Sequence, residues 1–236
     1  MAITKRILCL ANSRKNSDRC VAGREVTLAG AGPWIRPVGD ERGKAVSEKE
    51  RQYKDGEDPK LLDVIDVPLV RAVPHACQVE NWLLSPNDKW RCVGQAGWTE
   101  LLQFTETPAT LWVNGRSTFH AQHDEIPQAV ADKLPGSLFL IRVDRVHLHA
   151  FAKQGTFGND KRRMQARFMH AGVVYALWVT DPVVDSQYLA RPEGQYQLGE
   201  CCLTISLGEP FEKNNGQWYR YKLVAAIIRK DGGPWP

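Results

Sequence analysis

The amino-acid sequence predicts a mainly β fold with a few short helices, in which two five-stranded barrels are packed in tandem. Three observations predict it. Short runs of apolar and β-branched residues, ended by glycine or proline, fill both ends of the chain. The 236 residues are enough for two domains of about a hundred residues each. In the second half, a helix-like segment follows the third strand pattern.

The composition is that of an ordinary globular protein. Hydrophobic residues make up 43% of the chain and charged residues 25%, so it should bury a core and fold without a partner. The longest apolar runs, such as residues 223–228, are far shorter than the roughly 20 residues that cross a bilayer, and residues 1–10 lack signal-peptide features. We therefore expect a cytoplasmic protein without membrane contact, as a monomer or weak dimer.

Five segments of the first half have the composition of strands. The fourth of them contains Pro68, which argues for an edge strand or a bulge because proline cannot donate to a strand ladder. Together they predict a first five-stranded unit. The segments are residues 6–11, 19–28, 34–38, 64–73 and 75–84.

Helical signals lie among and after these strands. A helix is predicted at residues 47–53, where Ser47 and Glu50 have the spacing of a capping box. Residues 98–104 and 126–134 also have helical spacing, and Pro135-Gly136 follows the second of these segments. These breakers predict a linker at 134–137. The expected units are therefore residues 1–135, with helical and loop insertions, and residues 136–236.

Strand patterns resume after the linker. Ala171-Gly172 predicts a tight hairpin between the second and third of them. Asp181 followed by Pro182 predicts a helix start, with the acid as N-cap. Three strands, a helix and two more strands are the layout of an OB-fold, which the first half fits more loosely. The strands are expected at residues 138–149, 162–170, 173–180, 202–207 and 218–229.

Seven short segments together resemble the bacterial dual OB domain-containing proteins, over nearly the whole chain. The resemblance implies two OB-like barrels in one protein and a role in nucleic-acid processing or bacterial defence. It implies no catalytic residue. The segments are Ser13-Arg14-Lys15, Arg19-Cys20-Val21-Ala22-Gly23, Trp34-Ile35-Arg36-Pro37-Val38, Gln78-Val79-Glu80-Asn81, Thr180-Asp181-Pro182, residues 203–210 (LTISLGEP) and residues 221–228 (YKLVAAII).

No complete catalytic or metal-binding motif is present. The nucleophile-elbow, zincin, Walker and dinucleotide-binding motifs are all absent. His147 and His149 alternate on one strand, and His120, His123 and Asp124 share a polar stretch, but neither set has further ligands at zinc spacing. We predict no catalytic residue, no metal and no cofactor, and the absence of a motif does not exclude an enzyme.

The cysteines follow no C-x-x-C spacing and should stay reduced in the expected compartment. Free cysteine is among the most buried residue types, so we interpret them as small core residues. They are Cys9, Cys20, Cys77, Cys92, Cys201 and Cys202.

Positive charge is concentrated locally. The net charge of +4 is too mild to indicate a polyanion partner by itself, but two clusters could bind phosphates. The clusters are Lys5, Arg6, Arg14, Lys15, Arg19 and Arg24, with one acid among them, and Lys161, Arg162, Arg163 and Arg167.

In the first unit, a loop at residues 12–19 is expected to hold Ser13, Arg14, Lys15 and Arg19 close enough to bind a phosphate. Period-two alternation places Trp34 and Arg36 on one face of the next strand, where a ring beside a guanidinium suits base stacking. The alternative is a solvated loop, with Trp34 in the core and Arg36 covering it.

Gln78 and Asn81 both donate and accept hydrogen bonds, as reading a base edge requires. The alternative is that they satisfy backbone groups at a strand end. In the second unit, Arg163 and Arg167 share a strand face and Arg162 points the other way, with Tyr175 and Trp178 on the next strand. This pattern predicts an oligonucleotide surface, although Phe168 and Trp178 would also suit a barrel interior.

Three functions remain open. The leading one is a binding module for single-stranded or structured DNA or RNA. The second is a nucleotide or small-molecule sensor, or an enzyme, with a site between the units lined by Ser13, Lys15, Trp34, Gln78, Asn81 and Thr180. The third is an adaptor for a protein from the same operon, which would use the surface of Trp90, Trp98, Trp112 and Trp235.

Overall fold

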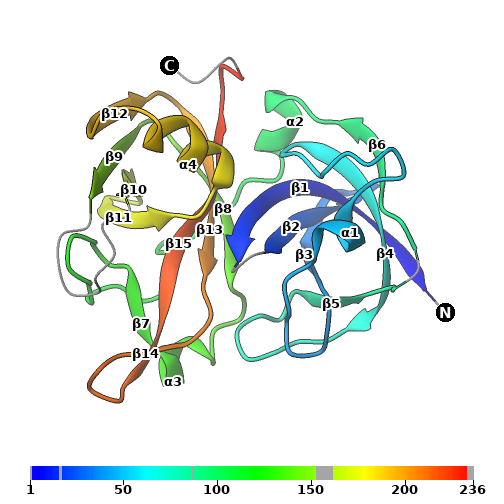
Figure 1. Cartoon of the computed structure of the whole chain (residues 1–236), viewed down its shortest axis with the longest axis horizontal. Helices are drawn as coiled ribbons and strands as arrows, with labels where there is room; N and C mark the ends of the chain where they lie inside the picture. Colours follow the sequence, from blue (N-terminus) through cyan, green and yellow to red (C-terminus); the bar gives the residue numbers. More distant parts are fainter. Residues whose placement is uncertain (1, 16–17, 87, 153–161, 233–236) are drawn as a thin grey trace. The chain divides into compact units, whose positions relative to one another are not determined.

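The structure is a computed structural model that describes residues 2–15, 18–86, 88–152 and 162–232. The chain divides into two compact units, and strands dominate both (Figure 1). Unit 1 comprises Met1–Thr105 and Asp132–Leu138, and unit 2 comprises Glu106–Ala131 and Phe139–Pro236. Residues 106–131 thus pack within unit 2, whereas a division at residue 135 would put them in the first unit. Independently folding domains at 1–135 and 136–236 stay a prediction.

Unit 1 is a ring of five strands with a sixth at its edge. The strand order is β1-β2-β3-β5-β4-β6, and β1 also pairs with β4, which closes the ring. The β3–β5 pair is parallel and its neighbours are antiparallel, as an OB-fold requires. The strands are β1 (Ile3–Lys15), β2 (Asp18–Thr27), β3 (Gly30–Val38), β4 (Asp63–Ala72), β5 (Asn81–Leu84) and β6 (Arg91–Gln95).

The core of unit 1 fills this ring. Every second side chain along these strands faces inward, because successive side chains of a strand point to opposite faces. Residues 7–11 of β1 are buried on both faces of the strand. Trp90 is fully buried among them and is a core residue. The inward set includes Ile7, Cys9, Val21, Ile35, Ile65, Val67 and Leu69.

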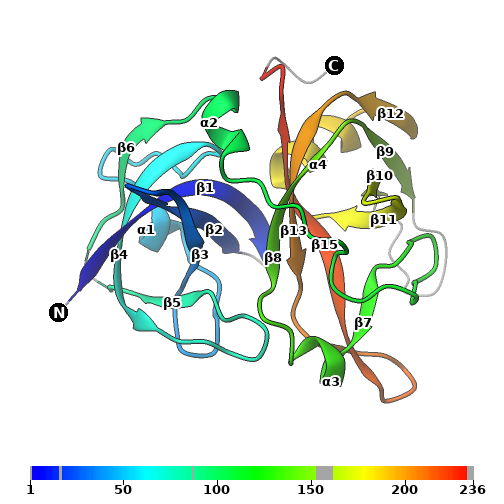
Figure 2. The ribbon, with the colours of Figure 1, turned by 180° about the vertical axis from the view of Figure 1, so that it is seen from behind.

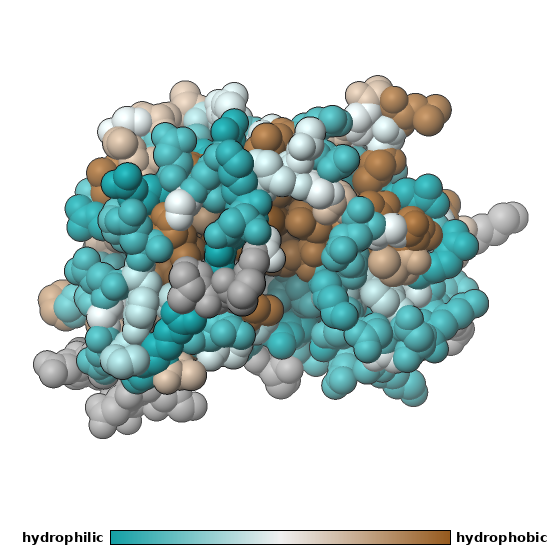
Figure 3. Space-filling view, turned by 90° about the horizontal axis from the view of Figure 1, so that it is seen from above, coloured by the Kyte–Doolittle hydropathy of each residue, from teal (hydrophilic) through white to brown (hydrophobic). Residues whose placement is uncertain are grey.

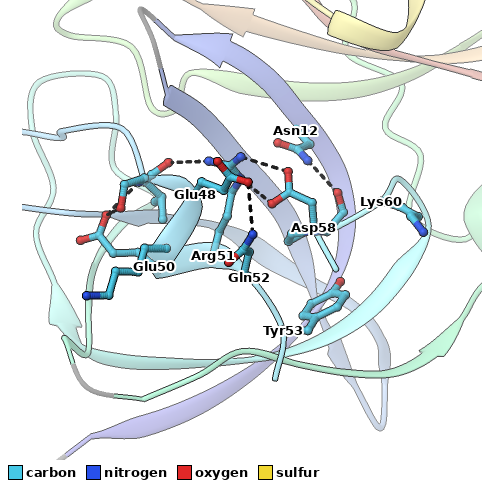
Figure 4. Close-up of polar contacts among 12 residues, drawn as sticks. Asn12, Glu48, Glu50, Arg51, Gln52, Tyr53, Asp58 and Lys60 are labelled. Atoms are coloured by element: carbon cyan, nitrogen blue, oxygen red, sulfur yellow. Dashed lines mark hydrogen bonds and ion pairs between the residues drawn. The ribbon is translucent and has the colours of Figure 1, made fainter. Parts of the chain in front are cut away.

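The charged insertion between β3 and β4 is held by polar contacts (Figure 4). Its short helix α1 (Glu48–Arg51) starts at Ser47, whose backbone N–H donates to Glu50 at 2.8 Å. Arg51 is buried and pairs with Asp58 at 2.8 Å. The amide of Asn12 on β1 donates to the Pro59 carbonyl at 2.6 Å. These contacts fasten the insertion to the barrel wall. A second helix, α2 (Trp98–Leu102), follows β6.

Unit 2 also has the strand pairing of an OB-like barrel. Its strand order is β12-β9-β10-β11-β15-β13-β8. β9 and β8 lie far apart in this order, but only Asp144 and Arg145 separate them in the chain. A bend of the chain at these two residues therefore connects β8 directly to β9. The β11–β15 pair is parallel. The strands are β8 (Leu138–Val143), β9 (Val146–Ala152), β10 (Arg162–His170), β11 (Val173–Val179), β12 (Gly194–Leu198), β13 (Cys201–Leu207) and β15 (Trp218–Arg229), with short β7 (Glu125–Pro127) and β14 (Phe211–Glu212) on β15.

Two local predictions in unit 2 are confirmed. Ala171 and Gly172 connect β10 to β11 with positive φ angles of 48° and 77°, the conformation of a tight hairpin turn. Asp181 caps α4 (Pro182–Leu189) by accepting from the N–H of Val183 at 2.9 Å. The mainly β class with two OB-like barrels is therefore confirmed. Figure 2 shows both units from behind.

Several expected boundaries were wrong. Residues 12–19 are not one loop, because β1 extends to Lys15 and β2 starts at Asp18, with Lys15 and Asp18 paired. Of the strand expected at 75–84, only β5 forms, since His75–Gln78 make a tight turn. The helix expected at 126–134 shrinks to α3 (Gln128–Ala131), because Ile126 and Pro127 pair with β15. For Pro68, the edge-strand alternative was wrong, because β4 lies between β1, β5 and β6. The bulge alternative fits the register shift of the β4–β5 ladder between Leu69 and Arg71.

The surface is largely polar on the face shown in Figure 3, with apolar groups between hydrophilic side chains. The cysteines are all free, and four of the six are buried, while Cys20 is half-buried and Cys92 is exposed. Among the described residues, no helix has the length and apolar character needed to pass through a bilayer. Trp112 is buried and Trp98 is half-buried, and Trp235 lies outside the described residues.

Candidate nucleic-acid interface

The outer face of β10 in unit 2 carries the exposed arginines. Met164, Ala166 and Phe168 are buried and point into the barrel. Arg163, Gln165 and Arg167 have the opposite parity, so they share the outer face. The expected common face of Arg163 and Arg167 is therefore present.

Aromatic rings flank this row from both neighbouring strands. Gln165 is opposite His149 on β9 and opposite Trp178 on β11. Phe151 on β9 is opposite Arg163. The ring centroids of His149 and Phe151 are 4.4 Å apart, and those of Phe151 and Trp178 are 5.7 Å apart. The three rings thus form a continuous group beside the arginines.

A segment before β7 adds two more rings. The backbone of Gln122 exchanges two hydrogen bonds with Ala176 of β11, which fixes this segment against the sheet. The ring of His120 lies 5.3 Å from that of Phe151, and Phe119, which is 74% exposed, lies 3.9 Å from His120. We call the resulting surface the aromatic–arginine face; it consists of Phe119, His120, His149, Phe151, Arg163, Gln165, Arg167 and Trp178.

The two arginines of this face are available to an anion. Both are exposed, and neither forms an ion pair with any residue in the described parts of the chain. A guanidinium binds phosphate oxygens through two parallel hydrogen bonds. Arg162 faces the other way, as predicted, and donates to the carbonyls of Leu189 and Arg191. Lys161 lies outside the described residues.

Tyr175 does not belong to this face, although the sequence placed it there. Its parity is that of the barrel interior, and it is fully buried beside Phe168, with the ring centroids 5.7 Å apart. Its hydroxyl oxygen accepts from the Asn114 amide at 2.9 Å and from the Leu111 N–H at 3.3 Å. Tyr175 is therefore a core residue that holds the segment before β7.

Arg36 is also internal. It is 4% exposed, forms an ion pair with Glu80 and donates to the Ser137 hydroxyl, all within unit 1. The guanidinium is thus neutralised inside the protein. Trp34, two residues earlier, is half-buried and is opposite Arg24 on β2. The expected exposed pair of ring and guanidinium is not formed.

The β1–β2 hairpin places the other unit 1 candidates. Arg14 and Arg19 are directly opposite one another on the two strands, and Arg14 is exposed. Ser13 is buried, and its hydroxyl donates to the Cys20 carbonyl at 3.5 Å. Lys15 donates to the Gly43 carbonyl at 2.6 Å. Arg14 and Arg19 are therefore a pair of cations, whereas Ser13 and Lys15 bind backbone oxygens.

Gln78 and Asn81 lie together in the interior of unit 1. Both are buried, and the Asn81 amide nitrogen is 3.4 Å from the Gln78 side-chain oxygen. A Cβ built on Gly43 would be 3.3 Å from the Asn81 amide, so the Gly43 backbone covers the pair. A base edge does not reach them in this conformation. The small-molecule site that combines these residues with Thr180 draws on both units and stays a prediction.

A buried lysine lies under the segment that carries Phe119 and His120. Lys222 is fully buried on β15, and its ammonium donates to Asn114 at 2.8 Å. Burial lowers the pKa of Lys222 to about 7, and the nearby carboxylate of Asp124 opposes this shift. Asp124 itself accepts from the N–H of Thr118 at 2.7 Å. These contacts fasten residues 114–124 to the barrel.

Sequence reasoning missed five members of the face, namely Phe119, His120, His149, Phe151 and Gln165. The alternation of His147 and His149 did indicate a shared strand face. Extending that alternation to Phe151, and that of Arg163 and Arg167 to Gln165, would have found three of them. Phe119 and His120 had no such signal, because their segment joins the sheet through long-range contacts.

A protein-family model described as "dual OB-containing domain" matches residues 5–227. No curated protein sequence matches the chain. In the described residues, no group of three or more histidine, cysteine, aspartate or glutamate side chains could hold a metal ion.

Proposed function

The chain belongs to the dual OB-containing domain family, and from this premise we propose that it binds single-stranded nucleic acid on the aromatic–arginine face of unit 2. OB-folds bind oligonucleotides on the face of their second and third strands. In unit 2 these are β10 and β11, which carry Arg163, Arg167 and Trp178. The supporting observation is that Arg163 and Arg167, which are exposed and have no ion pair in the described parts of the chain, share this face with aromatic rings.

The chemistry of the face suits a single strand better than a duplex. Bases stack on aromatic side chains only when their faces are free, as they are in single-stranded nucleic acid. Arg163 and Arg167 are four residues apart on one strand, or roughly 13 Å, so they would bind different phosphates. The rings of Phe151, Trp178 and His149 lie between and beside them, where the intervening bases would stack.

The proposal is tested by removing the two guanidiniums together. Arg163→Ala/Arg167→Ala should weaken binding of a labelled single-stranded oligonucleotide, measured by fluorescence anisotropy. It should also reduce the slope of log affinity against log salt by about 1.4, because each lost phosphate contact on a single strand contributes about 0.7.

A charge-matched control separates this effect from net charge. Arg71 and Arg91 are exposed arginines of unit 1 that pair with Glu41 and Asp66. Arg71→Ala/Arg91→Ala removes the same charge and should leave affinity and salt slope nearly unchanged. Equal losses in both double variants, or no binding by the wild type at low salt, would reject the proposal.

A further inference from the structure

Gln165 occupies the centre of the aromatic–arginine face. It lies between Arg163 and Arg167 along β10 and between His149 and Trp178 across the sheet. Directly opposite residues on neighbouring strands have Cβ atoms about 5 Å apart, so the amide is flanked by both rings. Gln165 is 7% exposed, which places its amide at the floor of the face rather than above it.

The orientation of this amide follows from its partner. The side-chain nitrogen of Gln165 donates to the backbone carbonyl of His120 at 2.8 Å. A carbonyl oxygen only accepts, so the nitrogen must be on the His120 side and the oxygen must point away from it. Within the described parts of the chain, that oxygen has no hydrogen-bond partner. The floor of the face therefore presents one hydrogen-bond acceptor of fixed orientation.

We propose that the Gln165 oxygen accepts a hydrogen bond from the exocyclic amino group of a base stacked on the neighbouring rings, and so makes the face prefer amino-bearing bases. This inference rests on the proposed function. Cytosine has an amino donor where uracil has a carbonyl acceptor. Uracil would bring an acceptor against the Gln165 oxygen and leave both atoms without a donor, which is costly at a buried position.

The sharpest probe pair is oligodeoxycytidine against oligodeoxyuridine of equal length, at about pH 8. The wild type should bind the cytidine strand about tenfold more tightly, the size expected for one hydrogen bond gained against one acceptor left unpaired. A third strand containing pyrimidin-2-one, which lacks both the amino group and the carbonyl at that position, should bind with intermediate affinity.

Substitution then assigns the preference to one side chain. Gln165→Met keeps the length of the side chain but has no acceptor oxygen, and it should abolish the cytidine preference while still binding both strands. Gln197→Met is the matched control. Gln197 is exposed, lies on β12 and is opposite His147 of the neighbouring strand β9. This control should retain the wild-type preference.

The outcomes separate the two proposals. If no strand binds the wild type at low salt, the proposed function fails. If the wild type binds cytidine and uridine strands equally, or if Gln165→Met keeps the preference, binding stands and the role of Gln165 is overturned. In the wild type, affinities that decrease in the order cytidine, pyrimidin-2-one and uridine strand would support the role of Gln165, and this test does not depend on whether any variant folds.

Discussion

At the scale of single residues, burial and internal ion pairing decide which cations can serve a ligand. Arg36 has a suitable side chain and a ring two residues away, yet Glu80 neutralises it in the interior. The local sequence does not distinguish Arg163 and Arg167 from Arg36. However, both lie on the outer face of β10, where they are exposed, and neither has an acidic partner in the described parts of the chain. Sequence composition alone does not distinguish these two situations.

Trp178 should supply stacking energy to the proposed interface. Trp178→Ala should weaken binding of a single-stranded oligonucleotide by about 1–3 kcal/mol, or roughly 5- to 150-fold, because one base loses its platform. Anisotropy titration measures the loss, and Trp178→Phe should restore most of it.

Trp218 provides the control for that substitution. It is 47% exposed on β15 of the same unit and is not part of the aromatic–arginine face. Trp218→Ala should therefore leave affinity unchanged, and a comparable loss in both variants would contradict the assigned surface. Thermal unfolding of each variant checks that the fold is retained.

Lys222 should make stability depend on pH. The pKa of Lys222 is lowered to about 7 in the folded protein, against an ordinary 10.5. Between pH 7 and pH 10.5, Lys222 is neutral in the folded protein but protonated in the unfolded chain, so the free energy of unfolding rises with pH. Below pH 7, Lys222 is protonated in both states, and burying its ammonium lowers the free energy of unfolding by the full amount. Lys222→Met removes this term.

The expected result is a difference between variant and wild type that changes with pH. Relative to the wild type, Lys222→Met should be most stable near pH 6 and should lose that advantage steadily toward about pH 10. Urea unfolding at several pH values measures it. Other titrating groups, such as the buried cysteines, are common to both proteins and cancel in the difference. A difference that is constant with pH would show that Lys222 does not titrate in this range.

At the scale of elements, tight strand pairing constrains particular positions. Gly23 of β2 is opposite Cys9 of β1, where the ladder shifts register. A Cβ at Gly23 would lie 2.0 Å from the Leu8 carbonyl oxygen, closer than two such atoms can approach. The β1–β2 pair, and with it the ring of unit 1, therefore requires glycine here.

Gly23→Ala should lower the free energy of unfolding by roughly 1–3 kcal/mol or more, since the backbone must shift to relieve the overlap. Gly94→Ala is the control, because Gly94 lies on the exposed strand β6 and a Cβ there meets no atom within 4 Å. Chemical unfolding measures both variants. Similar stabilities for the two would contradict the close approach of β1 and β2.

At the scale of the whole molecule, two units of one fold class present different surfaces. In unit 1 many cations are bound internally, as with Lys5 to Glu25 and Arg51 to Asp58. In unit 2 the outer sheet face keeps arginines and rings together. The mild net charge of +4 is consistent with local rather than global attraction of an anion. Repetition of a fold therefore does not imply that the proposed interface is repeated.

The sequence by itself determined the elements whose signals are local. The hairpin at Ala171-Gly172, the capped start of α4 and most strands of both barrels follow from turn chemistry, capping and residue type, which act within a few neighbouring positions. The order of these elements was enough to predict two OB-like barrels, and the family resemblance is likewise confirmed.

Only the tertiary structure decided which strand face is the interior. Alternation shows that Tyr175 and Trp178 point to opposite sides of β11, but closure of the barrel determines that Tyr175 is inside and Trp178 outside. Closure likewise brought Phe119 and His120 to β9 from a distant segment. The physical reason is that a side chain's environment depends on long-range strand pairing, which period-two patterns within one strand do not contain.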